Sequence, residues 1–258
     1  MKNRYINFLI ILVWPIIASA IALFFGVKTI LVSIILFLVL PSLYLSYLLP
    51  KSIIKSLIFS FVGALPIYIV IDYILHINGQ WFVPTIFSFR FLDAIPLEDF
   101  FWSLFFAYFV VMFYEFFFEF HNETKKWHPR MYFFIALLLF IFFVFLGLYL
   151  FYPNLLNFSY AYFFVAFFLL FLPAIIEIIY NPKLIRKLLP SSFYFLFLNF
   201  IYEITAIKLG WWHFPSSQYV GMFSIFNVQF PLEELFFYVI FLAVMVLATY
   251  DTFDDYKK

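Results

Sequence analysis

Long apolar runs with very few charges constrain this chain more than any other feature. Of its 258 residues, 67% are hydrophobic and 11% are charged, whereas a soluble domain carries about 25% charged residues. A helix needs about 20 apolar residues to cross the hydrocarbon core of a bilayer. We therefore predict an all-α membrane protein with eight spanning helices, over 6–26, 29–49, 56–77, 95–119, 131–151, 160–180, 190–208 and 230–250.

The basic residues predict the orientation of these helices. Lys2 and Arg4 precede the first run, and no small-residue cleavage site follows it, so we interpret this run as a helix and not as a cleaved signal peptide. With the N-terminus inside, 12 of the 15 Lys and Arg residues fall on the inner side and 3 on the outer side. Because loops rich in Lys and Arg stay in the cytoplasm, we predict an integral protein of a bacterial or archaeal cytoplasmic membrane with both termini cytoplasmic.

The chain also repeats itself at an almost constant offset. Pro41 and Pro173 lie 132 residues apart, as do Lys55 and Lys187, and Trp81 and Trp212 lie 131 apart. We divide the chain into a first repeat, 1–128, and a second repeat, 129–258. Each repeat holds an even number of predicted spans, so both have the same orientation, which predicts parallel repeats about an axis normal to the membrane.

Each repeat carries two adjacent carboxylates directly after a Pro-Leu pair. These are Glu98 and Asp99 in the first repeat and Glu233 and Glu234 in the second. A structural explanation is that acids stabilise a helix N-terminus, but it accounts less well for two adjacent acids at both sites. Carboxylates near hydrocarbon are costly and usually functional. Neighbouring helical residues point about 100° apart, so one acid of each pair can face the bundle interior.

Two further acids extend this pattern. Asp72 and Glu203 each lie nine residues before a tryptophan, Trp81 and Trp212. By the predicted orientation they share the outer level with the paired acids, so six carboxylates surround one site. A protonated carboxyl beside an ionised one is an acid–base pair suited to proton transfer. The candidate counter-cations at this level are Arg90, Lys208, His76 and His213.

Several functions are disfavoured by what the chain lacks. It has no cysteine, which excludes thiolate catalysis and iron–sulfur clusters. It has no glycine-rich phosphate loop, and its net charge of +1 gives no reason to expect a nucleic-acid partner. No spacing of His, Asp and Glu predicts a metal site, so we expect neither a metal nor a cofactor.

The doubled Pro-x-Glu-(Glu/Asp) motif, with an acid and a Gly/Trp loop before it, resembles the small integral-membrane lycopene β-cyclases. These occur as two short subunits or as one fused chain, and this sequence is similar to the fused form. The resemblance implies that linear lycopene ends are cyclised without net redox change, and that Glu98, Asp99, Glu233 and Glu234 are the motif acids, with Asp72 matching a further one. It also implies a lipophilic linear carotenoid as substrate and, as further partners, the lipid bilayer and other enzymes of the carotenoid pathway.

The residue types suit this chemistry independently. Cyclisation protonates an alkene, closes a ring through a carbocation and removes a proton, which paired carboxylates can carry out. Aromatic faces stabilise cations, although the 45 phenylalanines are equally explained by lipid contact. Two alternatives remain open: a carotenoid hydratase, which admits water to the cation, and a small cation-binding transporter or channel. The aromatic residues predicted to contact substrate are Trp81, Phe101, Trp102, Trp212, Phe236 and Phe237.

Overall fold

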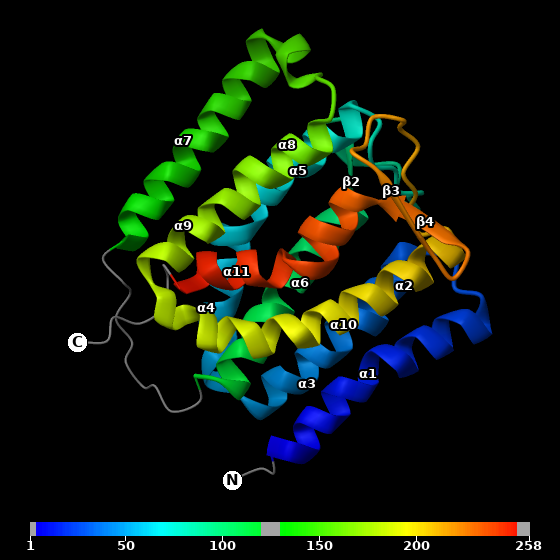
Figure 1. Ribbon diagram of the computed structural model, residues 1–258, viewed down its shortest axis with the longest axis vertical. Helices are drawn as coiled ribbons and strands as arrows, with labels where there is room; N and C mark the ends of the chain where they lie inside the picture. Colours follow the sequence, from blue (N-terminus) through cyan, green and yellow to red (C-terminus); the bar gives the residue numbers. More distant parts are fainter. Residues whose placement is uncertain (1–3, 120–129, 252–258) are drawn as a thin grey trace.

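The computed structural model describes residues 4–119 and 130–251, which form a bundle of helices capped at one end by two small hairpins (Figure 1). Six helical runs are long and apolar enough to cross a membrane. They are Arg4–Phe25, Ile30–Leu48, Pro50–Ile77, Leu97–Phe117, Ala161–Tyr180 and Pro182–Leu209. The prediction of a helical membrane protein is therefore confirmed.

The runs are made of shorter elements, several of which join end to end. In chain order, the helices and strands are α1 (Arg4–Phe25), α2 (Ile30–Ile34), α3 (Leu40–Leu48), α4 (Ile53–Ile58), α5 (Leu65–Ile77), β1 (Arg90–Phe91), β2 (Ile95–Pro96), α6 (Leu97–Phe117), α7 (Arg130–Phe151), α8 (Ala161–Ala166), α9 (Leu172–Tyr180), α10 (Ile185–Leu209), β3 (Met222–Ile225), β4 (Val228–Pro231) and α11 (Leu242–Asp251).

Four π-helical segments interrupt these runs, and three of them have a common cause. Ile35–Val39, Phe59–Ala64 and Phe167–Phe171 each end one residue before a Leu-Pro pair that begins the next α-helix. Proline has no N–H and its ring clashes with the carbonyl four residues earlier, and a wider turn ahead of it relieves that clash. The fourth segment, Glu234–Ile240, contains no proline and forms part of the site described below.

Two antiparallel hairpins lie at one end of the bundle, each leading directly into an acidic motif. Strands β1 and β2 pair before Leu97, and β3 and β4 pair before Leu232. Their turns place Leu92, Asp93, Phe226 and Asn227 at positive φ. The all-α prediction did not include these strands, because neither turn has the Asn-Gly or Asp-Gly signature of a tight hairpin.

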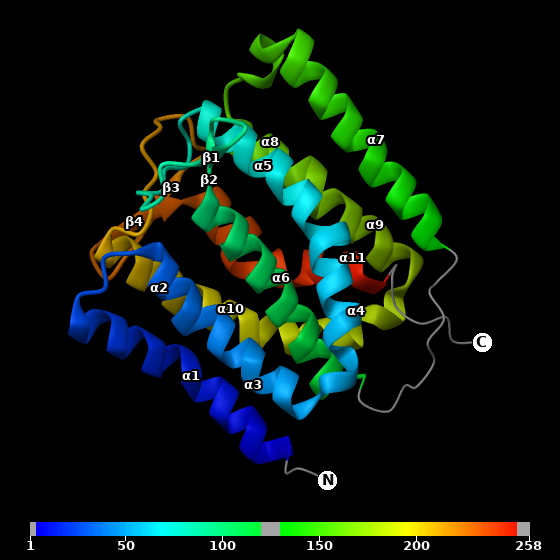
Figure 2. The ribbon, with the colours of Figure 1, turned by 180° about the vertical axis from the view of Figure 1, so that it is seen from behind.

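Helix α6 lies at the centre of the molecule. It runs between α2–α3 and α4–α5 and also contacts α11 and α10 (Figure 2). Of its most apolar 18 residues, 72% are buried, against 22% for α1, which lies at the edge of the bundle. Large apolar side chains such as Phe24 and Phe143 point outward from the peripheral helices, as expected where lipid surrounds the protein. The acids at the start of α6 are thus placed inside the protein.

Candidate functional site

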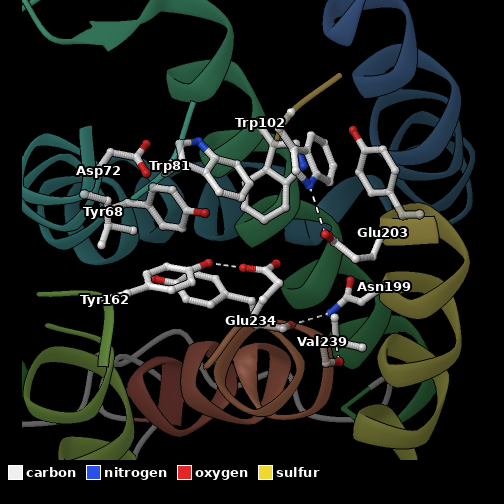
Figure 3. A pocket seen from close by; sticks show the side chains of 13 residues that line it. Tyr68, Asp72, Trp81, Trp102, Tyr162, Asn199, Glu203, Glu234 and Val239 are labelled. Atoms are coloured by element: carbon white, nitrogen blue, oxygen red, sulfur yellow. Dashed lines mark hydrogen bonds between the residues drawn. The ribbon is translucent and has the colours of Figure 1, made fainter. Parts of the chain in front are cut away.

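A small cavity lies inside the bundle just below the hairpins, with acidic, tyrosine and tryptophan side chains in its wall (Figure 3). Its volume is about 30 Å³, which leaves room for only a very few water molecules. Both repeats contribute to it. The wall consists of Tyr68, Asp72, Leu75, Trp81, Trp102, Tyr162, Asn199, Tyr202, Glu203, Trp212, Glu234, Tyr238 and Val239.

Two acids of the second repeat meet in this wall. The carboxyl groups of Glu203, on α10, and Glu234 lie close enough to interact with each other, and their residues are only 3% and 4% exposed. The Tyr162 hydroxyl donates to Glu234, and the Trp212 indole N–H donates to Glu203 at 3.1 Å. Since two adjacent carboxylates cannot both be ionised easily away from water, such a pair tends to hold a proton between them.

The π-helical segment presents Glu234 to the cavity together with Tyr238 and Val239. A π-helix has more residues per turn than an α-helix, so positions four and five residues apart share a face. Asn199 donates from its amide nitrogen to the carbonyls of Tyr238 at 3.0 Å and Val239 at 3.4 Å. These bonds hold the widened turn against α10.

The corresponding acids of the first repeat have different neighbours. Asp72, on α5, lies in the cavity wall, whereas Asp99, at the start of α6, lies behind Trp81. The Trp81 indole N–H donates to Asp99 Oδ2 at 3.3 Å, and His76 Nε2 lies 3.4 Å from the same oxygen. Asp72 and His76 are four residues apart and therefore share a helix face, a spacing that our sequence analysis did not use.

The two remaining motif acids bind loops and do not line the cavity. Glu98 accepts hydrogen bonds from the Ile86 amide at 2.7 Å and the Thr85 hydroxyl at 2.8 Å. Glu233 accepts from the Val220 amide at 2.6 Å. The expectation that adjacent acids point in different directions is met in both motifs: the first acid holds a loop and the second faces inward. The predicted ring of six carboxylates around one site is therefore not what the structure shows. Of the six acids, only Asp72, Glu203 and Glu234 reach the cavity.

Equivalent residues of the two repeats contact each other beside the cavity. The indole rings of Trp81 and Trp212 stack with their centroids 5.5 Å apart. Their successors, Phe82 and His213, exchange both backbone hydrogen bonds, at 3.1 and 3.0 Å. Each pair is separated by 131 residues in the sequence, and a reciprocal contact of this kind is typical of a two-fold interface.

Loop contacts around Gln80 cover the cavity on the side of the hairpins, and we call these contacts the roof of the site. Gln80 is fully buried and accepts a hydrogen bond from the Tyr162 amide, while the Tyr219 hydroxyl donates to the Gln80 carbonyl at 2.7 Å. Burial raises the pKa of the Tyr219 phenol above its usual range, so it remains a neutral donor. The roof therefore joins the loop of the first repeat to that of the second.

The predicted aromatic residues divide in the same way as the acids. Trp81, Trp102 and Trp212 line the cavity. Phe101, Phe236 and Phe237 do not: Phe236 is 41% exposed, and Phe237 packs among phenylalanines of the α8–α9 run. Sequence analysis missed Tyr68, Tyr162, Asn199, Tyr202 and Tyr238. A spacing of four residues from an acid, as in Tyr68–Asp72, Asn199–Glu203 and Glu234–Tyr238, would have found three of them.

No family model matches the chain, and no curated protein or solved structure is similar enough to it to be identified as a relative. An assignment of function therefore rests on the chemistry of the cavity and on the residue motifs alone.

Proposed function

We propose that this protein is a membrane-embedded carotenoid cyclase that converts the linear ψ-ends of lycopene into β-rings by proton transfer between carboxyl groups. One observation carries the proposal: three buried acids, Asp72, Glu203 and Glu234, converge on a cavity whose wall consists otherwise mostly of tryptophan and tyrosine rings, inside an apolar bundle. Such a site can supply and recover a proton while it excludes water. The motif resemblance points to the same chemistry.

The neighbouring carboxyl groups of Glu203 and Glu234 would act as the acid and then as the base. The pair gives one proton to the terminal double bond of the linear end, and the resulting cation is attacked by a neighbouring double bond, which closes the ring. Loss of a proton from the ring carbon back to the pair restores a neutral alkene. One proton is gained and one is lost, so the product has the mass of the substrate.

The cavity walls suit the carbocation between these steps. The π faces of Trp81, Trp102 and Trp212 can stabilise a positive charge over a ring. Because the cavity measures only about 30 Å³, the linear end must move side chains to enter. An occupied site then leaves no room for water to capture the cation, which favours proton loss over hydration.

A second, apolar cavity gives the rest of the polyene a place to extend. It also measures about 30 Å³ and shares Tyr68 with the acidic cavity. Its wall includes Phe59, Phe106, Leu170, Leu242 and Met245. With one end of the substrate in the acidic cavity, the rest of the polyene would extend past Tyr68 into this apolar space.

We further propose that the chain crosses the membrane eight times, as two parallel four-helix repeats with both termini cytoplasmic. Besides the six runs above, α7 and the segment from Glu234 to Asp251 are helical and apolar. The reciprocal pairing of Phe82 with His213 supports an axis between the repeats. Lys55 and Lys187 are equivalent basic residues, and they pair with Glu115 of α6 and with Glu119 just beyond its end. Both lysines therefore lie at the end opposite the hairpins, which supports the same orientation for the two repeats.

The deciding experiment expresses the chain in cells that accumulate lycopene and analyses the pigments. We expect a product with the mass of lycopene and one or two β-rings. Glu234→Gln should reduce its formation by at least about 100-fold, the usual size of a lost acid–base group. Glu177→Gln, which alters a membrane acid outside the cavity wall, is the matched control and should remain active. A product heavier by one water would replace the cyclase assignment with the hydratase, and unchanged lycopene would reject both.

A further inference from the structure

Three potential metal ligands gather behind the first-repeat wall of the cavity. Asp72, His76 and Asp99 each offer a ligand atom, and these atoms lie within 4.8 Å of one another. Asp72 and His76 come from the last turns of α5, and Asp99 comes from the first turn of α6. The side chains of His76 and Asp99 are only 6% and 5% exposed, so the cluster lies inside the protein.

The hydrogen bonding of His76 determines which nitrogen is free. Its Nδ1 lies 2.9 Å from the Asp72 backbone carbonyl. Since a carbonyl can only accept, Nδ1 must carry the proton, and in the neutral ring the Nε2 lone pair is unprotonated. Nε2 is buried without a hydrogen-bond partner among the described residues. This Nδ1–H to carbonyl bond is the usual way in which a protein orients a metal-binding histidine.

The free Nε2 faces the carboxyl group of Asp99, which offers it no proton to share when that carboxyl is ionised. It lies 3.4 Å from Asp99 Oδ2, so the lone pair of a neutral imidazole faces the lone pairs of a carboxylate. A cation between the two atoms removes this repulsion. Ligand atoms about 2.0–2.1 Å from a zinc ion in tetrahedral geometry are roughly 3.3 Å apart, which is close to the spacing found.

We propose that Asp72, His76 and Asp99 form a binding site for one divalent transition-metal ion of the zinc class. Two carboxylates and a neutral imidazole carry a charge of −2, which a divalent ion neutralises in a region away from water. One nitrogen and two oxygen ligands suit Zn²⁺ or Mn²⁺, and Zn²⁺ binds such a set more tightly. The Arg90 guanidinium lies near enough for its charge to act on His76 and Asp99, but it donates its hydrogen bond to the Ala94 carbonyl, at 2.8 Å.

The second repeat shows why only one such site is proposed. Ile207 occupies the position equivalent to His76 (76 + 131 = 207) and offers no ligand. Glu203 and Glu234 lie beside each other, and each accepts a hydrogen bond from an aromatic side chain, Trp212 and Tyr162 respectively, which suits a shared proton. The two acid pairs therefore differ: one is arranged for a proton and the other for a metal ion. This inference does not depend on the proposed cyclase activity.

The test measures metal content in the full-length protein, purified in detergent with a tag free of histidine. After treatment with a chelator, the protein is equilibrated with Zn²⁺, Mn²⁺ or Mg²⁺ alone and passed through a desalting column, and bound metal is quantified by mass spectrometry. We expect about one Zn²⁺ per chain, less Mn²⁺ and little Mg²⁺. Co²⁺ in place of Zn²⁺ should give the visible absorption of a low-symmetry four-coordinate site.

Variants distinguish this site from surface binding. His76→Leu and Asp99→Asn should each lower Zn²⁺ occupancy at least tenfold, whereas His213→Ala, which removes an exposed histidine outside the cluster, should keep it. Size-exclusion elution and tryptophan fluorescence identify any variant that fails to fold, and Asp72→Asn then serves as the replacement. Wild-type protein that binds less than a tenth of an equivalent of Zn²⁺, or His76→Leu protein that binds as much as wild type, would overturn the proposal whatever the pigment assay shows.

Discussion

At the scale of single residues, the adjacent acids of each motif have separate tasks. Glu98 and Glu233 accept hydrogen bonds from backbone amides of the outer loops, while Asp99 and Glu234 face the interior. A helix N-terminus favours both positions electrostatically, so the arrangement needs little reorganisation of the backbone. The Pro-Leu-acid-acid sequence thus joins a loop anchor to a chemical group one residue later.

This division predicts different outcomes for the loss of a loop-binding acid, Glu98, and the loss of a cavity acid, Glu234. Glu98→Gln should destabilise the protein by about 1–3 kcal/mol, because the amide of the buried Gln side chain puts a donor where the carboxylate accepted a hydrogen bond. Its turnover should fall through the loosened loop and recover in part at lower temperature, unlike that of Glu234→Gln. Thermal unfolding in lipid nanodiscs, measured beside pigment formation, checks this. Unchanged stability with no turnover would place Glu98 in contact with the substrate.

At the scale of helices and strands, the length of each apolar run predicted well where a helix lies, but it predicted poorly where a helix with polar first residues begins. The helical runs that begin at Pro50 and Pro182 start six and eight residues before the predicted positions 56 and 190. Their first turns contain Lys51 and Lys183, which an apolar-run criterion excludes although proline suits a first helical turn. The hairpins were missed because Phe226 and Asn227 adopt positive φ without glycine.

The residues of the site were likewise predictable only in part. Its acids were predictable because they are rare and repeated, whereas Tyr162 and Tyr238 were hidden among 19 tyrosines. The contact of Tyr162 with Glu234 joins residues 72 positions apart, and no local pattern encodes such a pairing. His76 was recognised only as a possible counter-cation, because its role depends on which atoms surround its free nitrogen.

One helix end gives a stability prediction with an internal control. Gly210 ends α10 at φ +70° with open space where a Cβ would lie, so Gly210→Ala should cost roughly 1 kcal/mol through the backbone alone. Gly147, inside α7, also has open space but an ordinary helical conformation. Gly147→Ala should therefore be neutral or stabilising. Unfolding midpoints of the two variants in the same detergent test this difference of sign, and a lower midpoint for Gly147→Ala alone would contradict it.

At the scale of the whole molecule, the proposed topology places both hairpins on the outer face. The chain has no cysteine, so a single introduced cysteine is the only thiol available for labelling. Ser88→Cys and Ser217→Cys, both at exposed loop positions, should react with a membrane-impermeant maleimide on intact cells. Lys183→Cys, at the opposite end, should react only after the cells are opened. Labelling of just one loop on intact cells would separate the two acid pairs across the membrane and reject the parallel repeats.

The reciprocal contact of Phe82 with His213 also bears on how such a chain could have arisen. If the two repeats descend from one four-helix unit, that unit once paired with an identical copy of itself, and each position beside the axis existed twice with the same residue. A substitution there changed both sides together. Joining the copies in one polypeptide removes that restriction, so a histidine can persist at position 76 while isoleucine stands at position 207. On that descent, the different acid pairs of this protein would be a specialisation that a tandem gene permits and a self-paired ancestor does not.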